Sequence, residues 1–426
     1  MTEQRRLLIR GGRVFDHDGD VHQPPVADIL IEADKIVAVG ADLAQQAGPA
    51  AEIIDAAGRL VAPGLINAHY HSHDVLCRGL FEELPLEMWL LYTLPMGAHR
   101  SKEEVRARTL VGALESLHAG ITTVQDMLGL VPFDEAYLDV VLAAYRDAGI
   151  RAVFSPMVAD IPAVNMVSRH DELPPEVQEM LGTKALAAKE QLDFLATQLR
   201  RHPAGERLHW AVAPFAPQRC TPQLLEGCAA LAERHDLPVY THVYETRGQA
   251  LIARQEFARH GGSLIADLDS AGLLGPRLNI VHSVWIARAE MERMAAADAG
   301  IVLNHLSNFK LKSGVAPVLD IREAGVRLGL GCDNCSGSDV QNMFQAMKMF
   351  CLIAAVSEPE PGQGLAHEVL RHATLGNARS AGLGGRLGAI RPGYKADLIL
   401  IDLNDIGYLP FNSAARQLVY AETGRA

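Results

Sequence analysis

Residues 62–71 read APGLINAHYH, and this stretch decides the fold. Its first part belongs to an apolar run, Val61–Ala68, that has the character of a buried strand. Polar residues follow at once, as His69 and His71. Side chains two residues apart on a strand face the same way, so both imidazoles can point to one place at the carboxyl end of the strand.

The pattern that begins there repeats along the chain. From about residue 55 to about residue 383, short β-branched apolar runs alternate with longer stretches of helical period. Eight runs are candidate strands, each followed by a helical stretch: Val61–Ala68, Gly120–Asp126, Ile150–Met157, Leu208–Pro214, Pro238–Val243, Leu278–Ser283, Gly300–Asn304 and Val326–Asp333. This pattern favours an α/β fold with a closed (β/α)8 barrel of the TIM type, although a doubly wound sheet can also have eight strands.

Both ends of the chain differ from this middle part. Residues 7–40 contain strands broken by Gly-Gly, Asp-Gly-Asp and Pro-Pro, and a similar strand pattern returns at residues 388–403. We expect the two ends, residues 1–62 and 384–426, to pair into one small β-sandwich domain, while residues 63–383 form the barrel. Because the chain ends soon after the last of these strands, a sandwich truncated at its C-terminus is a further expectation.

Composition and charge exclude several classes of protein. Of the 426 residues, 49% are hydrophobic and 21% are charged, which suits a globular protein with a sizeable core. The net charge of −12 includes no basic stripe, so nucleic acid is not expected as a partner. No stretch has the character of a signal peptide or a membrane span, and the six cysteines form no disulfide framework. These features predict a cytoplasmic protein with no membrane partner, and we expect a homo-oligomer.

A barrel places its active-site groups at the carboxyl ends of its strands. The polar residues of this chain follow that rule at four candidate strands, with His69 and His71 on the first, then His242, His282 and Asp333. Imidazole and carboxylate are ligands that Zn²⁺ accepts. A single histidine at a strand end is more often a structural polar residue, but several on different strands favour a metal site.

Glu245 lies three residues after His242, in the loop that follows the fifth candidate strand. A carboxyl group in this loop can reach a water on the metal and carry its proton to a leaving group. The alternative is a solvated loop glutamate, and the residues alone do not decide between the two interpretations.

A series of motifs resembles the amidohydrolase superfamily, and within it the branch of cytosine- and adenosine-type deaminases and chlorohydrolases such as triazine hydrolase. The opening APGLINAHYH carries the first resemblance. Further matches follow in order over nearly the whole chain: GITTVQDM from Gly120, THVYET from Thr241, VHSVWI from Val281, LSNFKLKSGVAPV from Leu306, GLGCDNCSGSD from Gly329 and GAIRPGYKADLILID from Gly388.

This resemblance implies one divalent metal per chain, Zn²⁺ or alternatively Fe²⁺, held by His69, His71, His242 and Asp333. It also implies that Glu245 is the proton shuttle, that His282 positions and polarises the attacking group, and that Asp333 accepts the proton from the water. Gln125–Asp126 provides no lysine where dinuclear relatives carry one, so a mononuclear centre is expected.

Departures from the family pattern concern the substrate. Phe215, within APFAP, stands where many relatives carry a histidine, and the stretch LYTLPMGAH from Leu91 lacks the glutamate of nucleoside-type deaminases. Residues 303–305 read LNH where relatives often have His-(Asn or Cys)-Pro. These losses argue against thioadenosine or homocysteinyl-adenosine substrates. The pocket for a flat ring is expected to be shaped by five residues: Trp89, Tyr92, Phe215, Gln218 and Asn308.

The predicted function is that of a metal-dependent aminohydrolase, or deaminase, which acts on a small nitrogen heterocycle through a metal-activated water. The same residues suit a chlorohydrolase or alkylamine hydrolase of triazines, or a cyclic amide hydrolase, because pocket shape selects the leaving group. A catalytically silent barrel with a binding role is the alternative from another class of protein. No expected metal ligand or shuttle residue is missing from the chain, which favours the enzyme.

Overall fold

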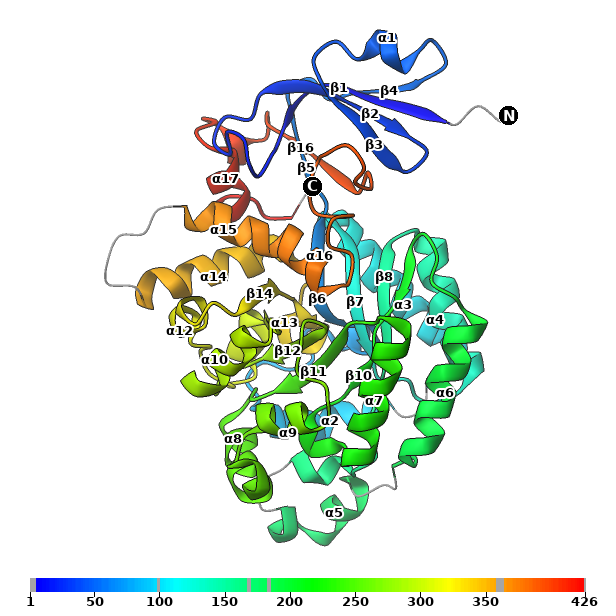
Figure 1. Ribbon diagram of the computed structural model, residues 1–426, viewed down its shortest axis with the longest axis vertical. Coiled ribbons are helices and arrows are strands. Elements are labelled where there is room, and N and C mark those ends of the chain that lie inside the picture. Colours follow the sequence, from blue (N-terminus) through cyan, green and yellow to red (C-terminus); the bar gives the residue numbers. More distant parts are fainter. Residues whose placement is uncertain (1–4, 98–99, 167–169, 182–184, 358–363, 425–426) are drawn as a thin grey trace.

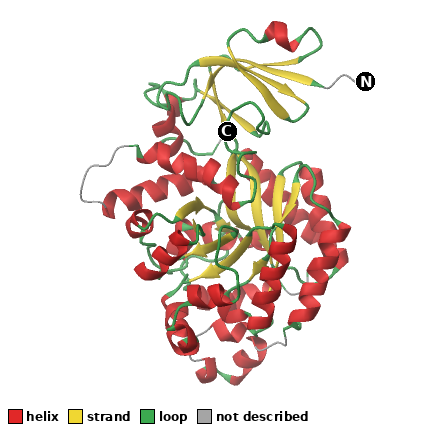
Figure 2. Ribbon diagram, in the orientation of Figure 1, coloured by secondary structure: helices red, strands yellow, loops and turns green. Residues whose placement is uncertain are grey.

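The structure is a computed structural model that describes residues 5–97, 100–166, 170–181, 185–357 and 364–424. It is an α/β fold in which helices surround a set of parallel strands (Figure 1). A further sheet lies at one end of the molecule, apart from these strands (Figure 2).

The parallel strands run through the larger part of the molecule. They are β6 (Leu65–His71), β7 (Ile121–Leu128), β8 (Arg151–Val158), β9 (Leu208–Trp210), β10 (Ala213–Pro214), β11 (Val239–Val243), β12 (Leu278–His282), β13 (Gly300–Leu303), β14 (Arg327–Leu330) and β15 (Asp333–Asn334). One sheet has the order β10-β8-β7-β6-β15, with β9 beside β8, and the other has the order β11-β12-β13-β14. A parallel bridge between Val212 and Val239 joins the chain beside β10 to β11.

The helices of this part follow the strands in the chain. They are α2 (Leu86–Met96), α3 (Lys102–His118), α4 (Glu135–Ala148), α5 (Pro175–Leu181), α6 (Ala188–Arg201), α7 (Pro222–His235), α8 (Arg247–Glu256), α9 (Leu264–Ser270), α10 (Arg288–Ala296), α11 (His305–Lys310), α12 (Val318–Glu323), α13 (Cys335–Ser338), α14 (Met343–Ser357), α15 (Leu365–Arg371) and α16 (Asn377–Ser380). Local sequence explains where several of them begin. The Thr221 side chain caps α7 by accepting from the Leu224 amide, and Pro222 occupies the first turn, where no backbone donor is needed.

Three of the predicted strands are interrupted in the structure. The interruptions lie at Gly64, between β5 (Arg59–Pro63) and β6, at Ala211, between β9 and β10, and at Gly331, between β14 and β15. A Cβ added to Gly331 would lie 2.7 Å from Cβ of His69, closer than packed side chains approach. Glycine therefore allows β15 to continue against the strand that carries His69.

The end sheet combines the two ends of the chain. Its order is β16-β5-β1-β2-β3, with β4 beside β1, and its further strands are β1 (Arg6–Val14), β2 (Val26–Glu32), β3 (Lys35–Gly40), β4 (Glu52–Asp55) and β16 (Leu398–Asp402). Helix α1 (Ala44–Ala47) precedes β4. Residues of β16 pair antiparallel with β5, from Leu398 opposite Pro63 to Asp402 opposite Arg59. The expected pairing of the two ends is thus present, as one six-stranded sheet.

The last described element is helical. Helix α17 (Ala414–Tyr420) buries Ala415, Leu418 and Val419 in the same apolar cluster as Phe344 of α14. This part of the expected β domain therefore packs against helices of the larger part. Among the residues that the structure describes, no helix is long and apolar enough to cross a membrane.

Candidate metal centre and active site

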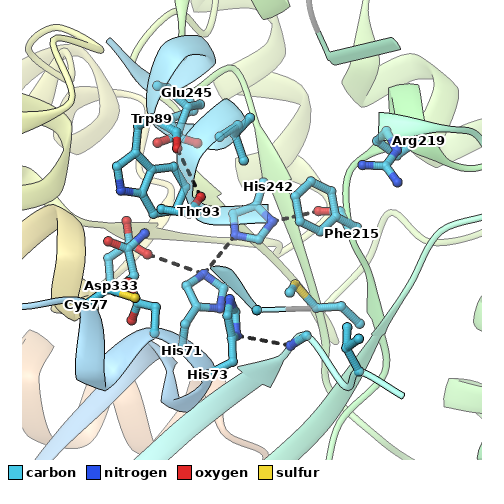
Figure 3. Close-up of a pocket in the computed structure, with 18 of the residues that line it drawn as sticks. His71, His73, Cys77, Trp89, Thr93, Phe215, Arg219, His242, Glu245 and Asp333 are labelled. Carbon is cyan, nitrogen blue, oxygen red and sulfur yellow. Dashed lines mark hydrogen bonds and ion pairs between the residues drawn. The ribbon is translucent and has the colours of Figure 1, made fainter. Parts of the chain in front are cut away.

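The predicted metal ligands meet at the carboxyl ends of the parallel strands. His69 Nε2 and His71 Nε2 each lie 3.3 Å from the same oxygen, Oδ1 of Asp333. His242 Nε2 lies 3.3 Å from His71 Nε2. Figure 3 shows His71, His242 and Asp333 pointing toward one another. The strand pairing explains this, because β15 begins with Asp333 beside β6, while β11 brings His242 from the other sheet.

Backbone carbonyl groups set the orientation of two imidazoles. His71 Nδ1 donates to the carbonyl oxygen of Met127 at 2.5 Å, and His242 Nδ1 donates to that of Phe215 at 2.7 Å. A carbonyl oxygen can only accept, so the proton of each neutral ring is on Nδ1. The Nε2 lone pairs are therefore directed into the cluster, which is the arrangement that a metal needs.

The donor set fits a divalent metal ion. His69, His71 and Asp333 each offer an atom within 4.8 Å of the others, and all three residues are buried. Two of these atoms, His69 Nε2 and Asp333 Oδ1, have no hydrogen-bond partner among the described residues. Buried polar atoms normally have a partner, and a cation between nitrogen and carboxylate atoms would supply one.

The protonation of the cluster also suits a metal. Burial lowers the pKa of His69 to about 3 and holds the pKa of His242 well below its usual value, with neighbouring imidazoles adding to the effect. Burial opposes the charge of Asp333, but the surrounding histidines hold the pKa of this carboxyl well below its usual value. Neutral imidazoles and an ionised carboxylate are the forms that bind metals.

The backbone is strained at two of the strand ends. His282 has a φ of 76° and Asp333 has a φ of 63°, values that residues other than glycine rarely adopt. Two neighbours of site residues, Tyr244 and Ser283, both have φ of 54°. Such conformations cost free energy and persist where the surrounding structure imposes them, which is common at functional sites.

Glu245 and His282 lie on one side of the metal cluster. Glu245 Oε2 is 3.5 Å from His282 Nε2, and that nitrogen is 4.0 Å from Asp333 Oδ2. His282 Nδ1 donates to Asn308 Oδ1 at 2.9 Å, so its Nε2 faces the two carboxyl groups. Burial and the charges of Asp333 and Glu87 raise the pKa of Glu245 well above its usual value. A glutamate with a raised pKa can hold a proton at neutral pH and release it to a base.

A cavity of about 170 Å³ opens beside the cluster. Its wall includes His71, His242, His282, Glu245 and Asp333, so three of the predicted metal ligands and the candidate proton carrier face the same space. Aromatic side chains from two other elements complete this part of the wall, namely Trp89 and Phe215.

The two aromatic residues are held by specific contacts. Trp89 is buried and donates from Nε1 to Ser336 Oγ at 2.9 Å. The ring of Phe215 lies 4.9 Å from the ring of His242, centre to centre, and Figure 3 shows it beside that residue. A flat substrate ring placed in the cavity would therefore have apolar faces next to it.

Three other predicted pocket residues lie elsewhere. Tyr92 is 53% exposed and packs against Phe81. Gln218 is buried and lines a different hollow. Asn308 is behind His282, where it orients that ring. In the part of the chain that the structure describes, none of the three lines the cavity at the metal cluster.

The cavity also has a wall that sequence reasoning missed. Arg100, Arg108, Arg219, His73 and Asp74 all line it. One signal was available: Arg108 lies three residues after Val105 and four before Gly112, on the face of α3 that is buried. An arginine on the apolar face of a predicted helix is unusual and could have been singled out.

Comparisons with known proteins agree with this geometry. The sequence matches the amidohydrolase family over residues 60–423. It is 33% identical to a 5-methylthioadenosine/S-adenosylhomocysteine deaminase of Thermococcus kodakarensis, with 98% of this chain and 90% of the relative covered. It is 31% identical to a 5'-deoxyadenosine deaminase of Methanothermobacter thermautotrophicus, with 99% of this chain and 90% of the relative covered.

Solved structures of similar proteins contain zinc. An adenosine deaminase from Xanthomonas campestris with bound zinc superposes with a TM-score of 0.84 at 28% identity, covering 99% of this chain and 90% of that chain. An atrazine chlorohydrolase from Arthrobacter aurescens in complex with zinc gives a TM-score of 0.85 at 25% identity, covering 98% and 92%.

The fold and the metal cluster define a metal-dependent hydrolase of carbon–nitrogen bonds other than peptide bonds. The chain belongs to the amidohydrolase family. The resemblance found in the sequence motifs is thereby confirmed.

Proposed function

We propose that the protein hydrolytically deaminates a small nitrogen heterocycle. The observation that carries this proposal is the position of Glu245, which is next to His282 and Asp333 and faces the cavity beside the metal cluster. An amidine-like ring carbon held there would have a proton donor on one side and an ionised carboxylate nearby. The relatives that are named as deaminases support the same reaction.

We propose that one Zn²⁺, with Fe²⁺ as the alternative, is bound by the four predicted ligands, His69, His71, His242 and Asp333. When bound, such an ion acts as a Lewis acid and lowers the pKa of a coordinated water. Asp333 Oδ2 accepts the proton of the attacking water. Glu245 Oε2 carries a proton to the ring nitrogen and then to the leaving amine. His282, oriented by Asn308, positions and polarises the attacking group.

We further propose that the parallel strands form a closed (β/α)8 barrel. The pairing of β15 with β6 and the bridge from Val212 to Val239 support closure at both places where the two sheets meet. Residues 63–383 would be this barrel, and the end sheet would belong to the small β-sandwich domain of residues 1–62 and 384–426.

We propose a cytoplasmic location and a homo-oligomeric state. The six cysteines are free and buried, which suits a reducing compartment. On helix α14, Leu352 is 45% exposed and Val356, four residues later on the same face, is 87% exposed. Apolar side chains grouped on one helix face support contact with another copy.

A screen for ammonia release tests the proposed reaction. The metal-loaded protein would be assayed with aminopurines, aminopyrimidines, pterins and aminotriazines. Release of ammonia supports deamination. Release of chloride or an alkylamine from triazines, or opening of a cyclic amide, would instead favour the alternative hydrolases. A protein that is silent on all of these would favour the non-catalytic barrel.

Metal content is expected to be about one divalent ion per chain, since a mononuclear centre with four protein ligands leaves one position for water. Elemental analysis of protein purified without chelator, and again after anaerobic loading with Zn²⁺ or Fe²⁺, measures this. Two ions per chain, or none after loading, would contradict the mononuclear centre.

Phe215→His is expected to change substrate preference without changing metal content. Phe215 lines the cavity and its ring lies beside that of His242, whereas the hydrogen bond that orients His242 is accepted by the Phe215 backbone carbonyl. The variant would add a hydrogen-bonding group to the cavity and leave the carbonyl in place. Relative kcat/KM over the heterocycle panel and elemental analysis test this. Loss of metal would place the Phe215 side chain in the metal centre instead.

A further inference from the structure

One part of the cavity wall is positively charged, because it contains buried arginines. Arg108, on α3, is 2% exposed, and Arg100, just before α3, is 7% exposed. Both line the cavity together with His71, His242 and Asp333. Arginine is almost never buried to this extent unless an anionic group accompanies it.

Arg108 has few partners inside the protein. One guanidinium nitrogen, Nη1, donates to the backbone carbonyl of His73 at 3.2 Å, while Nε has no hydrogen-bond partner among the described residues. The same described part of the chain places no carboxylate within 4.0 Å of this guanidinium. The carbonyl contact places Arg108 near the metal cluster, because the ring of His73 lies 5.1 Å from that of His71.

Arg100 is only partly neutralised. Its Nε is 3.6 Å from Glu104, and Nη2 contacts the Cys77 thiol at 3.6 Å. Its Nη1 is buried and lacks a hydrogen-bond partner within the described residues. Burial lowers the pKa of Arg108, and the charge of Arg100 lowers it further, while the charge of Asp126 partly opposes this.

The acidic residue on this wall does not neutralise the arginines. Asp74 lines the cavity, but its two oxygens accept three hydrogen bonds, from the amides of Cys335 and Ser336 and from the Ser336 hydroxyl. Arg100 and Arg108 therefore line a cavity in which a carboxylate could accept from their guanidinium groups.

We infer that the substrate carries a carboxylate, which Arg108 binds with the help of Arg100. This inference rests on the proposed deaminase function and adds a substrate class to it, namely a small aminoheterocycle with an acidic substituent. Phe215 and Trp89 would contact the ring of the substrate, and the arginines would fix the orientation of the substrate in the cavity.

The experiment compares carboxylate-bearing aminopyrimidines and aminotriazines with the matching carboxamides. For the metal-loaded protein, kcat/KM is expected to be about 10- to 100-fold higher for the carboxylates, the scale of a hydrogen bond between charged groups. Arg108→Gln should reduce this ratio toward one, mainly by raising KM for the carboxylates, and Arg108→Lys should restore part of it. Arg146→Gln, a change of an exposed arginine on α4, is the matched control and should leave the ratio unchanged.

The outcomes separate the two proposals. If the carboxamides are deaminated as well as the carboxylates, the inference is overturned and the deaminase function stands. If no heterocycle releases ammonia, the function fails, and calorimetric titration of an aminopyrimidine carboxylate into the wild type and Arg108→Gln still tests the inference. Equal affinity of the two proteins would overturn it. The wild-type ratio serves as the test if Arg108→Gln does not fold.

Discussion

Glu245→Gln is expected to lower kcat by about 10²-fold or more while the protein keeps its metal, because the amide cannot carry a proton. In the structure Glu245 is buried, lies 3.5 Å from His282 Nε2 and faces the cavity. Glutamine has nearly the same shape, so the packing and the metal ligands are retained. The missing function is proton transfer in the transition state, so substrate affinity need not fall.

The measurement is kcat, KM and metal content for the wild type and the variant, with the best heterocycle from the screen. Glu87→Gln provides a matched control. Glu87 is close enough to raise the pKa of Glu245 and accepts from Thr246 Oγ1 at 2.7 Å, but the described cavity wall does not include it. The amide oxygen of glutamine can still accept that bond, so kcat should fall by less than about 10-fold. Near-normal kcat in metal-loaded Glu245→Gln would refute the shuttle role.

Asp333→Asn is expected to reduce both metal content and turnover, with kcat at saturating Zn²⁺ lower by about 10²-fold or more. Asp333 Oδ1 lies 3.3 Å from both His69 Nε2 and His71 Nε2. Among these three residues only Asp333 is negatively charged, so only Asp333 can offset the charge of the ion. A neutral amide is a weaker ligand and cannot accept a proton from water.

Metal titration followed by elemental analysis, with kcat at each metal concentration, separates the two effects of Asp333→Asn. Asp126→Asn is a suitable comparison, since Asp126 is a buried carboxylate on β7 that accepts from Ser72 and Tyr145. It should leave metal content at the wild-type level. Full metal content together with normal turnover in Asp333→Asn would remove this residue from the centre.

Strand ends were the most predictable part of the site. The alternation of apolar runs and helical stretches, together with the rule that polar groups gather at the carboxyl ends of parallel strands, brought together His69, His71, His242, His282 and Asp333. The structure places these residues in one cluster. The positions of these residues follow from strand register, which can be inferred from the alternation of apolar and polar residues in the sequence.

Residues on helices and loops were less predictable, because their direction depends on packing between distant segments. Gln218 and Asn308 come from segments near the site, yet Gln218 lines another hollow and Asn308 supports His282 from behind. Arg108 was not predicted as a site residue. It lies on α3, and only the folded structure shows that the buried face of this helix contacts the backbone of His73.

The sheet shared by the two ends of the chain constrains synthesis on the ribosome. Strand β5 has its outer partner in β16, which the ribosome makes more than three hundred residues later. Until then the backbone groups of β5 on that side form an open edge, which can pair with other chains. Contacts between residues so far apart in sequence also form late in folding. A nascent chain halted before Leu398 would therefore expose this edge, and binding by a chaperone during translation would protect it.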